Sequence, residues 1–175
     1  IGAYFGSPTA LIFVGVFLLV TLLSFFWVET FYARNIADVR PLFERMPVLM
    51  IFLAGVLTMR QWSEEQRGGT MEVLLTLPVQ RPLLVIGKFI GVMMLIVSSL
   101  AVTLVLPITV SVLGDLDWGP VAGGYVAALL MSSAYVAIGL FVSSRTDNQI
   151  VSFILAVLIC SVLYVAGTTG VTGVV

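Results

Sequence analysis

Residues 83–113 read LLVIGKFIGVMMLIVSSLAVTLVLPITVSVL, and Lys88 is the only charged residue among them. An α-helix rises about 1.5 Å per residue, so about 20 apolar residues cross the roughly 30 Å hydrocarbon core of a bilayer. This stretch therefore predicts a membrane-spanning helix. Lys88 is close enough to the start of the stretch for its ammonium group to reach toward water, and Pro107 predicts a kink.

The composition of the whole chain points the same way. Of its 175 residues, 60% are apolar and 10% are charged, and the mean hydropathy is +1.16. Soluble globular domains carry about 25% charged residues, so the chain is excluded from that class. A net charge of −1 without any basic run argues against nucleic acid as a partner. With no histidine and a single cysteine, Cys160, the chain is expected to hold no metal and no intrachain disulfide.

Apolar stretches elsewhere in the chain predict further spans. The complete set of predicted spans is 9–28, 47–62, 83–113, 120–142 and 150–166. The side chains of the glycine-rich tail after the last span are too small for the tail to predict another span. We therefore expect an all-α membrane protein, a polytopic helical bundle that forms one transmembrane domain over residues 1–175. In the fourth span, the stripe of Gly124, Ala128 and Ser132 predicts packing against another helix.

The connector 29–46 places Tyr32, Ile36, Val39 and Phe43 on one helical face. That spacing predicts an amphipathic helix on the external membrane surface. An ordinary polar connector with anchoring aromatic side chains fits the same residues, and both interpretations stay open.

The connector 63–82 is the most polar part of the chain. Basic residues are more numerous on its side of the membrane, which predicts that this side is cytoplasmic. The residues compared are Arg60, Arg67, Arg81, Lys88 and Arg145 on this side, against Arg34, Arg40 and Arg45 on the other.

Within that connector, residues 63–79 read SEEQRGGTMEVLLTLPV. A pair of glycines allows a sharp turn, after which Thr70 caps a short helix over 71–77. Glu72 lies in the first turn, near the positive end of the helix dipole, and Pro78 ends the helix. The result is a short cytoplasmic helix with apolar and charged side chains.

This segment resembles the permease subunits of ABC-2-type ABC transporters. Those permeases carry a Glu- and Arg-rich stretch, then Gly-Thr, a hydrophobic residue and Glu, then Leu-Leu, Thr and Pro, and a Gly-Lys pair that opens the third span. The matching residues are Glu64, Glu65, Arg67, Gly69, Thr70, Met71, Glu72, Leu74, Leu75, Thr76, Pro78, Gly87 and Lys88. With Met59, Arg60 and Trp62 before it and LDWGP at 116–120 after it, the segment is similar more narrowly to the gliding-motility permease branch.

The resemblance implies a type V exporter-like permease in a bacterial-type inner membrane, with a coupling helix that docks into a groove of an ATPase subunit. The residues implied in coupling are Glu64, Glu65, Arg67, Gly69, Thr70, Met71, Glu72, Leu75 and Pro78. The chain has no GxxxxGK[ST] motif, so ATP and Mg²⁺ are expected on the partner ATPase and no catalytic residue is expected here. A second permease copy, identical or related, and membrane lipid are the other implied partners.

The family has six spans with both termini in the cytoplasm, whereas five spans are visible here. We expect the sixth to follow the end of this chain, and IGAYFGSP at its start to be the remnant of an interfacial helix.

Other functions fit parts of the pattern. A non-transporting membrane scaffold would use the same loop to anchor a cytoplasmic ATPase or a motility or secretion assembly. A proton-driven carrier or membrane enzyme is disfavoured, because the predicted spans contain no Asp, Glu or His. The hydroxyl groups in the spans either line a substrate corridor or, as we favour, bond to helix backbones. They belong to Ser98, Ser99, Thr103, Thr109, Ser111, Ser132 and Ser133.

Overall fold

The computed structural model describes residues 8–24, 40–62, 65, 68–69, 81–114 and 116–172. Regular structure in these ranges is helical, without a strand, which confirms the predicted all-α class. The helices are α2 (Pro8–Leu23), α4 (Arg40–Thr58), α7 (Arg81–Thr103), α8 (Val105–Leu113), α9 (Trp118–Ser143) and α10 (Gln149–Thr172).

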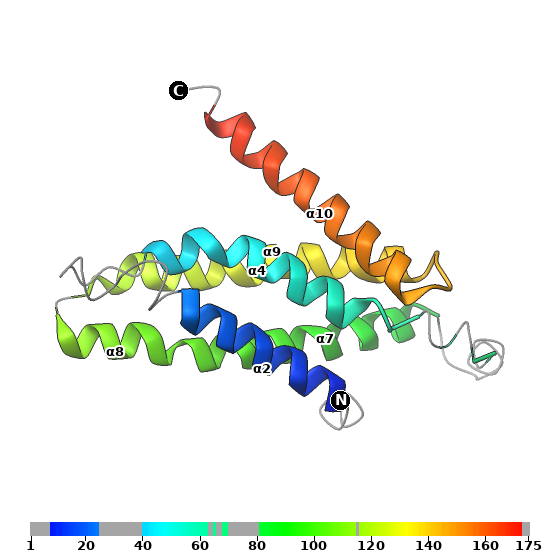
Figure 1. Ribbon diagram of the computed structural model, residues 1–175, viewed down its shortest axis with the longest axis horizontal. Helices are drawn as coiled ribbons and strands as arrows, with labels where there is room; N and C mark the ends of the chain where they lie inside the picture. Colours follow the sequence, from blue (N-terminus) through cyan, green and yellow to red (C-terminus); the bar gives the residue numbers. More distant parts are fainter. Residues whose placement is uncertain are drawn as a thin grey trace.

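Helices α2, α4, α7, α8 and α9 lie alongside one another in an up-and-down bundle (Figure 1). The end of α4, the start of α7 and the turn from α9 to α10 are at the same end of this bundle. The end of α8 and the start of α9 are at the opposite end. Helix α10 begins against the bundle and then leaves it at an angle, so that its C-terminal half stands apart (Figure 1).

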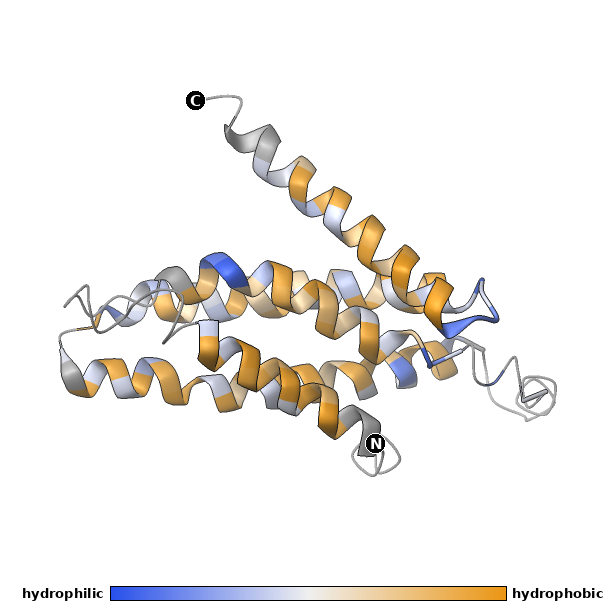
Figure 2. Cartoon of the chain, viewed as in Figure 1, coloured by the Kyte–Doolittle hydropathy of each residue, from blue (hydrophilic) through white to orange (hydrophobic). Residues whose placement is uncertain are grey.

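The outer surface of the bundle is apolar. Leu130 and Ile150 are each 67% exposed, and Figure 2 shows hydrophobic residues along the outside of the helices. Among the residues that the structure describes, three helical segments are long and apolar enough to cross a membrane, namely Pro82–Val112, Trp118–Ser143 and Gln149–Thr168, and Leu11–Leu23 is a shorter apolar helix. Water cannot favourably cover so much apolar surface, so the helices are suited to lipid.

Helix α4 begins earlier than the predicted span at 47–62. It runs without interruption from Arg40 through Pro47 to Thr58, so residues 40–46 of the predicted connector 29–46 belong to the same helix as the span. Pro47 lacks the N–H that would bond one turn back, but Met46 and Met50 beside it are almost fully buried and hold the helix in the core. The predicted amphipathic residues Tyr32, Ile36 and Val39 lie outside the described residues.

Helix α10 also exceeds its predicted range. It continues to Thr172, past the expected end at Ala166 and into the glycine-rich tail. Glycine weakens a helix by about 1 kcal/mol relative to alanine. In an apolar environment, however, the backbone groups of a non-helical tail would lose their hydrogen bonds, which costs more.

A single residue, Leu104, separates α7 from α8, close to the position where Pro107 predicts a kink. The proline nitrogen cannot donate a hydrogen bond to the carbonyl of Thr103, and the proline ring crowds that carbonyl. The chain instead tightens, with the Leu104 N–H bonded to the Ala101 carbonyl at 3.2 Å. Helical bonding resumes when the Ile108 N–H bonds to the Leu104 carbonyl at 3.2 Å.

Helices α4 and α9 run parallel and make the closest contact in the bundle. The Phe43 ring lies against Gly124, the Thr58 side chain lies against Gly139, and the Trp62 N–H bonds to Ser143 Oγ. In each contact the two residue numbers differ by 81, so the helices keep one register over roughly 28 Å. The predicted packing stripe is part of this interface, since Ala128 and Ser132 are also buried.

Hydroxyl groups inside the helices bond mainly to their own backbone. All seven of the serine and threonine residues considered above donate to a carbonyl three or four positions earlier, as Ser99 Oγ does to the Leu95 carbonyl at 2.7 Å. The bonds to the backbone that we favoured are therefore present for all of these residues.

Candidate functional site

The candidate site is the base of the connector between α4 and α7. Of the residues implied in coupling, the structure describes Glu65 and Gly69. The remainder lie outside the described residues, and so does the predicted helix 71–77; these are Glu64, Arg67, Thr70, Met71, Glu72, Leu75 and Pro78.

Lys88 is the centre of this site. Its ammonium group is 2.7 Å from Glu65 Oε1, donates a hydrogen bond to the Gln61 carbonyl and lies 4.2 Å from the centre of the Trp62 ring. Its side chain is 11% exposed. Instead of reaching toward water, as expected from its place near the start of α7, Lys88 is enclosed by the segment that follows α4.

Helix geometry explains this orientation. Side chains of an α-helix lean toward its N-terminus, and Lys88 follows the start of α7 by about two turns, so its long side chain extends toward the connector. Withdrawing an ammonium group from water is costly unless a charge and hydrogen bonds replace the water. The Glu65 carboxylate, the Gln61 carbonyl and the face of the Trp62 ring supply that replacement.

Ser143 joins this group from the end of α9. The Trp62 N–H donates to Ser143 Oγ at 3.2 Å, and that hydroxyl donates to the Met59 carbonyl at 3.3 Å. The second bond satisfies the Met59 carbonyl directly after the last residue of α4, and the first satisfies the Trp62 N–H in the turn that follows. We call the residues Gln61, Trp62, Glu65, Lys88 and Ser143 the loop clamp. It joins the end of α4 and the start of the connector to α7 and α9.

Gly69 lies farther along the connector, in an exposed turn. Its φ of +66° is in the left-handed region, where a Cβ atom is strained, and this confirms the sharp turn predicted for the glycine pair. No other part of the described structure lies within 4 Å of the position that a Cβ on Gly69 would take. The glycine is therefore needed for its backbone conformation.

Some residues of this site could be identified from the sequence, and others could not. Glu65 and Lys88 were both singled out, but their pairing across 23 positions depends on how the connector folds back on α7. Ser143 was not singled out, because a serine at the end of an apolar stretch has no distinguishing pattern. Gly87, the neighbour of Lys88 in the resemblance, is exposed and meets nothing within 4 Å.

Comparison with known proteins places the chain in one family. Residues 9–175 match a family model described as ABC-2 family transporter protein. No curated protein matches the chain, and no solved structure does. The match agrees with the resemblance found in the connector, while the narrower similarity to the gliding-motility branch stays a prediction.

Proposed function

Because the chain belongs to the ABC-2 transporter family, we propose that it is the membrane-spanning permease subunit of an ATP-driven transporter, of the exporter kind. The chain would act beside a second permease copy and bind a separate ATPase subunit that holds ATP and Mg²⁺. The apolar surface of the bundle and its membrane-length helices support the membrane role.

The loop clamp is the observation that carries the coupling role. A connector that transmits force must be fixed to the helices that it moves, because a slack connector would absorb the displacement. Here Lys88 ties Glu65, Gln61 and Trp62 to α7, and Ser143 ties Trp62 to α9. A push on the connector 63–82 from a closing ATPase would therefore reach both helices.

The parallel pair α4 and α9 offers a path from this end of the bundle to the other. Small residues bring the two helices together near both ends, at Gly124 beside Phe43 and at Gly139 beside Thr58. Close-packed helices move as rigid bodies more readily than they deform. A displacement at the clamp would then tilt the pair and change the opposite end of the bundle.

The proposal is tested by purifying the full-length protein gently from its native membrane and identifying the proteins that accompany it. We expect a P-loop ATPase at equal stoichiometry, with ATP turnover that depends on this chain. Recovery of an ATPase whose turnover is the same without the chain would support the scaffold function instead. Repeated recovery without any ATPase would contradict both the coupling role and the transporter assignment of this subunit.

A further inference from the structure

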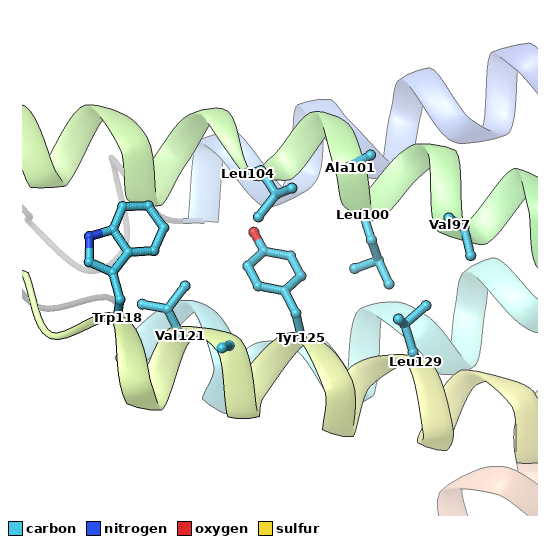
Figure 3. Close-up of a pocket in the computed structure, with 9 residues that line it drawn as sticks. Val97, Leu100, Ala101, Leu104, Trp118, Val121, Tyr125 and Leu129 are labelled. Carbon is cyan, nitrogen blue, oxygen red and sulfur yellow. The ribbon is translucent and has the colours of Figure 1, made fainter.

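An apolar cleft lies between α7 and α9, at the end of the bundle opposite the loop clamp. It has a volume of about 320 Å³, which is within the usual range for a ligand pocket. Figure 3 shows the side chains of the two helices facing each other across it. Its lining residues are Val97, Leu100, Ala101 and Leu104 on one side and Trp118, Val121, Ala122, Tyr125 and Leu129 on the other.

The cleft offers an occupant apolar contact and very little else. Its one hydroxyl group, on Tyr125, is 3.1 Å from Thr103 Oγ1 and shares a hydrogen bond with it. The Tyr125 ring is also fixed from behind by an edge-to-face contact with Phe43, with ring centres 5.3 Å apart. A polar or charged ligand would lose its water there without compensation, so the chemistry selects a hydrocarbon.

The cleft opens on the exposed apolar surface of the described bundle. Val97, Leu104 and Trp118 line it and are 47%, 37% and 49% exposed, and both helices are long and apolar enough to span a membrane. Where this surface contacts the bilayer, the surrounding medium is hydrocarbon.

The dimensions of the cleft match one leaflet. Trp118 is at one end of it, and Val97 and Leu129 are at the other (Figure 3). Trp118 begins its helix, at the depth where tryptophan favours the interface with the headgroups. From Trp118 to Leu129 the helix rises roughly 16 Å, about half of a 30 Å hydrocarbon core.

We propose that this cleft binds one acyl chain of a phospholipid from the leaflet on the Trp118 side, with the headgroup beside the indole and the chain end near Val97 and Leu129. The interruption at Leu104 contributes to the site, because this residue lines the cleft at the point where α7 gives way to α8. The inference is independent of the proposed coupling role, since none of the lining residues belongs to the loop clamp.

The test uses vesicles of phosphatidylethanolamine and phosphatidylglycerol that contain a trace of phosphatidylcholine with a diazirine near the end of one acyl chain. After reconstitution and illumination, mass spectrometry locates the labelled residues. We expect labelling concentrated on 97–104 and 118–129. The variant Ala122→Phe fills the cleft from α9 and should lower this labelling at least fivefold, and Ala101→Phe should do the same from α7.

The matched control is Ala127→Phe, which adds the same ring at an exposed position of α9 outside the cleft. It should leave the labelling unchanged, and thermal unfolding should show that the variants remain folded. Even labelling around the outside of α9, or an equal loss in Ala122→Phe and Ala127→Phe, would mean annular lipid only and would overturn the proposal. Labelling by a free diazirine fatty acid but not by the phospholipid would also overturn it.

Discussion

Lys88 shows how one buried charge organises a segment of chain around it. Its partners come from three kinds of group, a carboxylate, a carbonyl and an aromatic face, and all three belong to residues 61–65. Since Lys88 is mostly buried and Glu65 is 27% exposed, we expect their pairing to contribute more to stability than a pair on an open surface does. Each partner therefore compensates for part of the hydration that the ammonium group has lost.

We expect Lys88→Met and Glu65→Gln each to lower the free energy of unfolding by about 1–2 kcal/mol, since each removes one side of a charged hydrogen bond. Because both changes remove the same interaction, the double variant should lose less than the sum of the two. Unfolding in mixed micelles of dodecylmaltoside and sodium dodecyl sulfate measures these values. Strict additivity would show that the two side chains do not interact in the folded protein.

Gly139 requires its small size, whereas Gly123 on the same helix does not. A Cβ on Gly139 would lie 2.8 Å from Thr58 Cβ, closer than such atoms can pack, so Gly139→Ala should cost about 1–3 kcal/mol as α4 and α9 separate. A Cβ on Gly123 would meet nothing within 4 Å, so Gly123→Ala should be neutral or stabilise the helix by up to about 1 kcal/mol. The same micelle assay compares the two variants. Equal effects would contradict the close approach of α4 and α9.

At the level of elements, the sequence predicted most of the helices but little about how the helices pack against one another. Apolar length was sufficient to place α7, α8 and α9, and Pro107 was sufficient to place their interruption. The start of α4 could not be predicted, because Pro47 and the charged residues before it resemble a break until the burial of Met46 and Met50 is known. The constant register between α4 and α9 is a tertiary property without any local signal.

That register predicts a specific cross-link. Thr58→Cys with Gly139→Cys, in a protein whose natural Cys160 is replaced by alanine, should form an intrachain disulfide under mild oxidation. A β-carbon added at Gly139 would lie 2.8 Å from Thr58 Cβ, so a separation of the helices by about 1 Å brings the two β-carbons to the distance that a disulfide spans. Maleimide labelling after denaturation should then find both thiols blocked. Thr58→Cys with Gly123→Cys is the control and should keep both thiols, because Gly123 lies far along α9 from Thr58.

For the molecule as a whole, the alternation of the helices sets which connectors share a side of the membrane. The described ends of α4 and α9 and the start of α7 are together, in agreement with the grouping of connectors used for the distribution of basic residues (Figure 1). The sequence thus indicated the fold class and the grouping of connectors, as well as two members of the loop clamp, Glu65 and Lys88. It could not indicate the apolar cleft, because a cleft depends on the spacing between helices and not on the type of residue that lines it.

Single cysteines test this topology. In a background of Cys160→Ala, Gly68→Cys and Asp147→Cys should react with an impermeant maleimide from the same side of sealed vesicles, and Asp117→Cys should react only from the other side. Inside-out and right-side-out vesicles of the native membrane allow labelling to be measured from each side of the membrane. Labelling of Gly68→Cys and Asp117→Cys from the same side would contradict the arrangement of α7, α8 and α9 as membrane-spanning helices.

The central claim is that the loop clamp connects the connector 63–82 to the helices, and ATP turnover of the reconstituted complex tests it most directly. The complex with the ATPase that we propose as its partner would be assembled in vesicles with the wild-type chain, with Lys88→Met, and with Arg145→Gln as the control. Arg145 lies near the same end of the bundle but outside the clamp. We predict that Lys88→Met still binds the ATPase but loses at least tenfold of the turnover that depends on this chain, while Arg145→Gln retains it. Normal turnover with Lys88→Met, in a complex of normal stoichiometry, would contradict the account.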